Sequence, residues 1–239
     1  MYVSDCIQIL IIGYAIGSIP FGVVLAKLFR LPDPRYIGSG NIGATNMLRT
    51  GNRKVALLTL LLDAGKGVAA VITVTILLIP STNTMPAAME SAGCFSHTAW
   101  SQEAQLQCDQ LAAQMHHYPL LALAVLAAAI GHMYSPWLKF KGGKGVATLF
   151  GGALAFSWPV GMAGLFVWLI VVFTTRYVSL GSIAALALAP LVAWLRVDGT
   201  SAFILAIAAA IAIYKHAPNI KRLRQGFEPK LKFSKGDHA

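Results

Sequence analysis

Charged residues are scarce in this sequence of 239 residues. Asp, Glu, Lys and Arg make up 12% of the chain, about half of the roughly 25% that is usual in soluble domains. Apolar residues make up 56%, and the mean hydropathy is +0.65. This composition excludes an ordinary soluble domain and indicates a protein of the lipid bilayer.

Strict alternation of apolar and polar residues is also missing, for example in the runs AVLAAAIG and AALALAP. A transmembrane β-barrel would need strands of about ten alternating residues. The apolar runs are instead mostly near the roughly 20 residues that a helix needs to cross the hydrocarbon. They cover 7–28, 55–79, 118–137, 146–173, 178–195 and 201–214. The sequence therefore predicts an all-α, polytopic integral membrane helical bundle.

The first apolar run, 7–28, differs from a signal peptide. It lacks a basic segment before it, carries Asp5 there, and is longer than the apolar core of a signal peptide. We expect it to be a retained helix.

Positive charge is absent from the longest polar segment, 81–117, which contains Glu90, Glu103 and Asp109. Lys and Arg gather instead at 27–54, at 139–144 and at 215–235. The positive-inside rule places such basic segments in the cytoplasm. We expect the N-terminus and the insert to lie outside and the C-terminus to be cytoplasmic.

This orientation requires an odd number of spans. The run 146–173 is interrupted by Ser157, Trp158 and Pro159, and proline is a natural helix break. Counting it as two short helices gives seven transmembrane helices, which is our prediction. Counting it as one gives six, and merging 178–214 as well gives five, which is the alternative.

We expect one membrane-embedded domain over 1–239, with an external polar insert at 81–117 and a basic cytoplasmic tail at 216–239. Of the three cysteines, Cys94 and Cys108 lie in the insert, where a disulfide and two free thiols both stay open. No group of Cys, His or Asp has metal-ligand spacing, so we expect no metal. We also expect no cofactor.

The segment 38–46, GSGNIGATN, matches the glycine spacing of a dinucleotide fingerprint. That motif should follow a strand, but prolines precede it here, and Asp63, the candidate acidic partner, lies inside an apolar span. Ser39 and Asn41 in this loop, with Arg49 beyond it, are the residue types of an anion pocket. An ordinary interfacial loop is the alternative.

The segment 138–148, LKFKGGKGVAT, is not a P-loop, because glycine follows Lys144. Flexible backbone beside a lysine at a helix start still suits an anion. Membrane anchoring would explain the lysines but not the three glycines Gly142, Gly143 and Gly145, which cost conformational entropy.

Two further pairs of polar residues are candidate site residues. Asp63 and Lys66 lie three residues apart within a span, where charges usually pair and face the bundle interior; a structural ion pair and a substrate contact both stay open. His216 and Asn219 follow the last span. His216 could be a general base, a phosphate ligand or neither.

Together, four segments resemble the bacterial membrane acyl-phosphate–glycerol-3-phosphate acyltransferases. They are GSGNIGATN at 38–46, DAGKG at 63–67, GHMYSPWLKFKGGKGVAT at 131–148 and YKHAPNIKRLRQGFE at 214–228, in order and spacing over nearly the whole chain. The insert 81–117 is longer than the family pattern. No histidine has an Asp five positions on, so the His-x-x-x-x-Asp motif of other glycerolipid acyltransferases is missing.

The resemblance implies a seven-helix enzyme that transfers a fatty acyl group from acyl phosphate to the 1-hydroxyl of glycerol 3-phosphate. The products would be lysophosphatidic acid and phosphate, in the first acylation of bacterial phospholipid synthesis. It implies that glycerol 3-phosphate is held by Arg49, Lys144, Ser179, His216 and Asn219. Ser39, Asn41 and the backbone of 142–145 would lie near the acyl phosphate. Either His216 or a substrate phosphate oxygen would accept the hydroxyl proton.

The expected partners are therefore glycerol 3-phosphate, acyl phosphate and membrane lipids, with no nucleic acid, and the expected state is a monomer. We expect the site to face the cytoplasm from the inner membrane. A transporter for an organic phosphate is the main alternative, but it should show a polar path and repeated halves. The sequence shows no internal repeat, and its polar groups gather at one face. A purely structural protein would leave the glycine-rich loops without a purpose.

Overall fold

The computed structural model describes residues 3–78 and 117–231. Cys94, Cys108 and nearly all of the predicted insert lie outside the described residues. Every regular element in the described ranges is a helix or a 3-10 turn. The α-helices are α1 (Val3–Ser18), α2 (Phe21–Leu28), α3 (Ala44–Met47), α4 (Arg53–Leu78), α7 (Tyr118–Met133), α8 (Val146–Phe156), α9 (Trp158–Thr175), α10 (Val178–Arg196), α11 (Gly199–Lys215) and α12 (Ala217–Arg224). The 3-10 turns are η1 (Pro34–Tyr36), η2 (Leu48–Thr50) and η4 (Pro136–Leu138).

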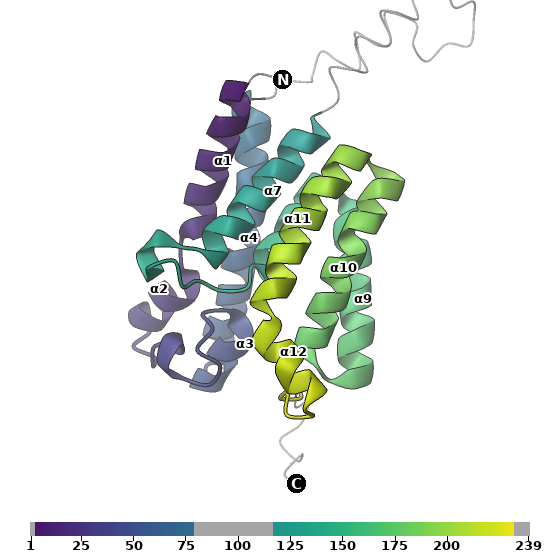
Figure 1. Ribbon diagram of the computed structural model, residues 1–239. Helices are drawn as coiled ribbons and strands as arrows, with labels where there is room; N and C mark the ends of the chain where they lie inside the picture. Colours follow the sequence, from purple (N-terminus) through teal and green to yellow (C-terminus); the bar gives the residue numbers. More distant parts are fainter. Residues whose placement is uncertain (1–2, 79–116, 232–239) are drawn as a thin grey trace, which may run out of the picture.

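The long helices run side by side, and α2, α3 and α12 lie at one end of the bundle (Figure 1). The start of α1 and the start of α7 lie at the opposite end. Helix α7 is the centre: it packs against α1, α4, α8 and α11. The end with α2, α3 and α12 carries the candidate site residues.

Large apolar side chains cover the outside of the bundle, and several polar and charged ones are buried inside it beside an apolar core. On α4, Leu61 and Ile76 are 59% and 72% exposed, whereas Thr59, Asp63 and Lys66 are 0–3% exposed. Charges within membrane helices face the interior in this way, because lipid cannot solvate them. The apolar outer surface confirms the prediction of an integral membrane bundle.

Small residues bring the helices into close contact. A methyl group on Gly17 of α1 would lie 2.0 Å from the carbonyl oxygen of Ala128 in α7. One on Gly67 of α4 would lie 2.1 Å from the carbonyl oxygen of Thr148 in α8. Close approach through glycine and alanine is typical of membrane helices, whose association depends on van der Waals contact.

Five segments are long and apolar enough to cross a membrane, and the pair α11 and α12, bent by 58°, gives a sixth candidate. The break predicted within 146–173 is confirmed, since α8 ends at Phe156 and α9 begins at Trp158. Helix α8 has only 11 residues. A count of seven requires α8 to be a span of its own.

The first apolar run forms one candidate span, Ser4–Leu28, as expected, but it is divided into α1 and α2. Pro20 lacks a backbone N–H, and the helix is interrupted between Ser18 and Phe21. The carbonyl groups freed at this break find side-chain donors. Ser135 Oγ donates to Ser18 O at 2.6 Å, and Lys66 Nζ donates to Ile19 O at 2.9 Å.

Candidate active site

The lysine of the glycine segment lies at the centre of the polar end of the bundle. Lys144 Nζ donates to Asn219 Oδ1 at 2.5 Å, and Asn219 Nδ2 donates to Glu228 Oε1 at 2.6 Å. The other oxygen of Glu228 accepts from Arg222 Nε at 2.7 Å. This chain of contacts joins the loop before α8 to α12 and to the segment after it.

The ionisation of this group follows from its surroundings. Burial lowers the pKa of Lys144 to about 8; the Glu228 carboxylate opposes this shift, and the positive charges of Arg222 and Arg49 add to it. Burial alone would raise the pKa of Glu228, but hydrogen bonds from Asn219 and Arg222, together with the nearby Ser179 hydroxyl, lower it overall. The site thus holds a carboxylate next to a lysine that loses its proton near pH 8.

Ser179 and His216 lie beside the same group. Ser179, in the first turn of α10, is buried; its hydroxyl influences Glu228 although its Oγ makes no hydrogen bond of ordinary geometry. His216 is fully buried at the junction of α11 and α12. Its Nδ1 lies 2.7 Å from Ala212 O, which can only accept, so Nδ1 carries the proton and Nε2 keeps a lone pair.

The segment 38–46 forms a loop around one asparagine. Asn46 Nδ2 donates to the carbonyl groups of Pro34, Ile37 and Asn41 at 2.8–3.1 Å, and its Oδ1 accepts from Ser39 N at 3.1 Å. Gly38 has a φ of +52°, and a methyl group there would meet the Arg49 guanidinium. The loop is therefore built against Arg49, which in turn acts on Lys144.

Ser39 and Asn41 are held in this loop by backbone hydrogen bonds to Asn46. Arg49 connects the loop with Lys144, because it lies against Gly38 and its charge acts on Lys144. The Asn41 Oδ1 atom is buried and has no hydrogen-bond partner. Buried polar atoms are nearly always satisfied in folded proteins. An amide oxygen can pair only with a donor, so the donor that Asn41 offers to an anion is its Nδ2.

The glycines of 142–145 do not all offer their N–H groups to a ligand. Gly142 N donates to Met133 O at 3.2 Å, and Gly143 N donates to His132 O at 3.1 Å. Both glycines lie so close to the end of α7 that any side chain would clash. Gly145 has a φ of +76° and is the N-cap residue of α8, whose first N–H groups have no partner within the helix. Lys144, Gly145 and the start of α8 are thus the backbone that can face an anion.

Asp63 and Lys66 form an ion pair of 2.9 Å deep in the bundle. His132 Nδ1 of α7 lies 3.5 Å from the same oxygen of Asp63. The His132 ring also packs against the backbone of Gly143, so the pair is connected through His132 to the residue before Lys144.

Sequence reasoning placed Asn46 in an anion pocket, not at the centre of the loop, and gave no role to His132 or Glu228, although all three lie within the recognised motifs. Glu228 lies in the predicted basic tail, which is folded as far as it is described: Leu231 N donates to Arg176 O at 2.7 Å. An isolated acid among basic residues was the available signal for Glu228.

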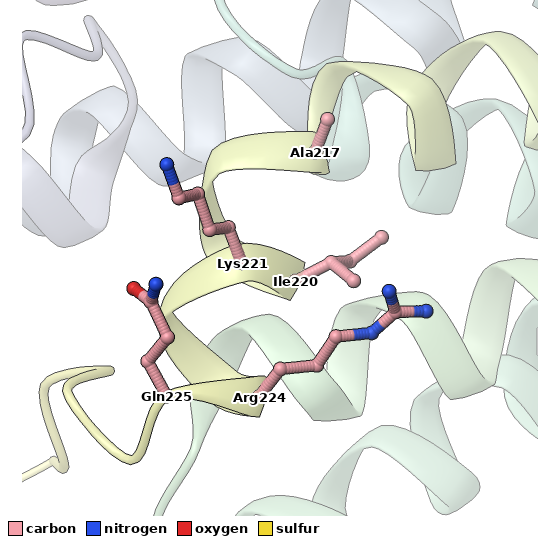
Figure 2. A pocket seen from close by; sticks show the side chains of 5 residues that line it. All are labelled: Ala217, Ile220, Lys221, Arg224 and Gln225. Carbon is pink, nitrogen blue, oxygen red and sulfur yellow. The ribbon is translucent and has the colours of Figure 1, made fainter.

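A hollow of about 390 Å³ lies along α12 (Figure 2), and none of the predicted site residues lines it. Lys221 and Gln225 extend from one side of the helix, and Ile220 and Arg224 from another. The hollow is lined by Ala217, Ile220, Lys221, Arg224 and Gln225. It adds positive charge to the end of the bundle that carries the site.

Comparison with known proteins identifies the family. Residues 7–226 match the family described as "Glycerol-3-phosphate acyltransferase". Proteins of that name from Roseobacter denitrificans and Rhodospirillum rubrum are each 42% identical to the chain. The alignments cover 92% of this chain in both cases, and 92% and 88% of the respective relatives.

Two crystal structures share the fold. Both are of PlsY (YgiH), an integral membrane glycerol 3-phosphate acyltransferase. Its glycerol 3-phosphate form has a TM-score of 0.72 at 33% identity, covering 95% of this chain and 96% of that one. Its lysophosphatidic acid form has a TM-score of 0.70 at 32% identity and covers 95% of each. The chain therefore belongs to the glycerol-3-phosphate acyltransferase family and is an integral membrane acyltransferase.

Proposed function

We propose that this protein transfers a fatty acyl group from acyl phosphate to the 1-hydroxyl of glycerol 3-phosphate. The products are lysophosphatidic acid and inorganic phosphate. The observation that carries the proposal is the hydrogen-bonded group Lys144–Asn219–Glu228 with Arg49 beside it. It concentrates positive charge and hydrogen-bond donors at one end of the bundle, as a phosphorylated substrate requires.

Glycerol 3-phosphate is held by Arg49, Lys144, Ser179, His216 and Asn219 in this proposal. The glycerol 3-phosphate form of PlsY, at 33% identity, supports this substrate. Arg49 and Lys144 come from different segments, but they are close enough for the charge of Arg49 to lower the pKa of Lys144. Two cations can neutralise a phosphate dianion better than either alone.

Acyl phosphate lies near Ser39, Asn41 and the start of α8. It is a mixed anhydride with a good leaving group, so the enzyme mainly has to neutralise charge and align the hydroxyl with the carbonyl. The Ser39 hydroxyl and the Asn41 Nδ2 amide are donors that suit its phosphate and carbonyl oxygens. Gly145 contributes a backbone N–H, whereas Gly142 and Gly143 turn the chain and hold it against α7.

The hydroxyl proton goes to a phosphate oxygen of the substrate or to His216 Nε2. The lone pair on Nε2 makes the second route chemically competent. Replacement of His216 by Gln separates them. Loss of turnover with unchanged glycerol 3-phosphate affinity would assign the proton to His216, whereas weaker binding with residual turnover would leave it with the phosphate.

Seven spans with an outside N-terminus and a cytoplasmic site complete the proposal. The start of α1 and helix α12, the last helix described, lie at opposite ends of the bundle (Figure 1), as an odd number of spans requires. Helix α8, at 11 residues, is then a short span. The protein acts as a monomer in the bacterial inner membrane, among membrane lipids.

The direct experiment incubates the purified protein with palmitoyl phosphate and labelled glycerol 3-phosphate. Lysophosphatidate should form without acyl-CoA or acyl carrier protein. Product that appears only when acyl-CoA or acyl carrier protein replaces palmitoyl phosphate would overturn the donor assignment. Release of labelled glycerol 3-phosphate across a vesicle membrane without acylation would instead support a transporter.

Lys144→Ala tests the site in the same assay. Loss of one preorganised cation should lower kcat/KM by about 10²–10³-fold, as loss of a single oxyanion donor does. Lys141→Ala is the matched control, because Lys141 is exposed in the same loop and should stay near wild-type activity. Equal effects of both changes would contradict the assignment.

A further inference from the structure

Three ionisable side chains lie together in the interior of the bundle, away from the proposed substrates. Asp63 and Lys66 of α4 and His132 of α7 are 2–4% exposed. Asp63 Oδ1 lies 2.9 Å from Lys66 Nζ and 3.5 Å from His132 Nδ1. Such residues are costly within a membrane, so they usually serve function.

Lys66 is fully engaged within the bundle. Besides Asp63, its ammonium group donates to Ile19 O at 2.9 Å and lies 5.6 Å from the centre of the Phe21 ring. The lysine therefore joins α4 to the break between α1 and α2. The Lys66 side chain is only 2% exposed, which argues against direct substrate contact.

The other edge of the His132 ring faces the glycine segment. A methyl group on Gly143 would lie 2.1 Å from His132 Nε2, so the ring packs directly against the Gly143 backbone. Gly143 N also donates to His132 O at 3.1 Å. His132 thus contacts Asp63 with one edge and the residue before Lys144 with the other.

We propose that Asp63, Lys66 and His132 are positioning residues. They fix the position of the 142–145 segment relative to the end of α7, so that Lys144 reaches Asn219 and the substrate phosphate. A glycine-rich segment is free to adopt many conformations. A ring held by a buried carboxylate removes that freedom before the substrate binds, which lowers the cost of binding. The proposal rests on the proposed function in that Lys144 binds the phosphate of glycerol 3-phosphate.

A double-mutant cycle on His132 and Gly143 tests the contact. Gly143→Ala should raise the KM for glycerol 3-phosphate by about tenfold or more with a smaller change in kcat, because a misplaced cation weakens substrate binding. His132→Asn, which removes the Nε2 edge, should raise the KM as well. The double variant should resemble His132→Asn alone, because the shorter side chain leaves room for the new methyl group.

His132→Gln provides the conservative comparison. Its amide extends to about the position of Nε2, so this variant should keep a lower KM than His132→Asn. Gly65→Ala is the matched control on α4, because a methyl group there meets nothing within 4 Å. The thermal unfolding temperature of each variant in detergent shows whether it is folded.

Measuring binding as well as turnover separates failure of the positioning role from failure of the proposed acyl-transfer function. Equilibrium binding of labelled glycerol 3-phosphate is measured for the same variants, so a wrong acyl donor abolishes turnover while the coupling is still seen in binding. Independent effects that multiply in the double variant would overturn the positioning role. So would folded His132→Asn and Gly143→Ala variants with wild-type affinity. A wild-type protein that does not bind glycerol 3-phosphate would overturn both proposals.

Discussion

Lys144 Nζ lies 2.5 Å from Asn219 Oδ1, a residue 75 positions later in the chain. The contact joins the two segments that carry most of the proposed glycerol 3-phosphate ligands. An amide oxygen orients the ammonium group without neutralising its charge, whereas a carboxylate in direct contact would compete with the phosphate. Glu228 stays one residue removed, on the far side of Asn219.

The affinity for glycerol 3-phosphate should fall above pH 8. Burial lowers the pKa of Lys144 to about 8, so the lysine loses its charge while the substrate stays dianionic. We expect the KM to be constant near pH 7 and to rise by up to about tenfold per unit above pH 8. In Lys144→Arg this rise should disappear, because a guanidinium stays charged. A wild-type KM that is flat to pH 9.5 would contradict the assignment.

The same pKa predicts that stability rises with pH in the alkaline range. The folded protein releases the Lys144 proton near pH 8, whereas an unfolded chain keeps it until about pH 10.5. Between these values the unfolded state binds more protons, so the free energy of unfolding should increase with pH. Thermal unfolding of the wild type and Lys144→Met in detergent measures this contribution. The difference in unfolding temperature between the two proteins should narrow or change sign as the pH rises from about 8 to about 10.5.

Glu228→Gln should weaken glycerol 3-phosphate binding. The carboxylate accepts from both Asn219 and Arg222, but a glutamine amide has only one oxygen. Asn219 would lose its orientation toward Lys144, and we expect the KM to rise by about tenfold. Asp33→Asn is the control, since its bridge to Arg35 lies at the surface with both side chains partly exposed and surface pairs contribute little. A KM unchanged in Glu228→Gln would place Glu228 outside the site.

Asn46→Ala should disrupt the loop that carries Ser39 and Asn41. The side chain satisfies three carbonyl groups and one N–H, and each buried group left unpaired costs about 1–3 kcal/mol. We expect the free energy of unfolding to fall by about 3 kcal/mol or more, with loss of activity. Asn52→Ala should cost only about 1 kcal/mol, because Asn52 accepts one hydrogen bond at the start of α4. Comparable thermal unfolding of both variants would contradict this role.

Gly67→Ala should separate α4 from α8. The new methyl group would lie 2.1 Å from the Thr148 carbonyl oxygen, and overpacking of this kind costs about 1–3 kcal/mol. Gly65→Ala, two residues earlier on the same helix, meets nothing and should stabilise the helix by about 0.5–1 kcal/mol. Thermal unfolding in detergent distinguishes the two. A destabilised Gly65→Ala would show that backbone effects dominate.

The sequence predicted the helices well where hydropathy and proline mark their ends. Pro159 indicated the break between α8 and α9. Pro20, within an equally apolar run, interrupts the first helix and was overlooked, because averaged hydropathy does not register a missing backbone donor. Helix boundaries inside apolar runs depend on single residues that composition does not show.

The site was predictable as a set of segments but not as a set of contacts. Lys144 and Asn219 were expected at the site, and the structure joins them. The roles of Gly142 and Gly143 depend on which carbonyl groups lie opposite their N–H groups, and this is decided by the end of α7. The role of His132 depends on Asp63 in another helix. Such contacts between distant segments have no signature in local spacing.

The return of the chain after α12 has a practical consequence for handling this protein. Leu231 N is bonded to Arg176 O, and Lys230 lies over the Tyr177 ring at 5.4 Å, so residues 226–231 cover the connection between α9 and α10. A truncation before Glu228 would remove the carboxylate that orients Asn219. An affinity tag or fusion partner is therefore better attached before α1, at the end of the bundle remote from the site.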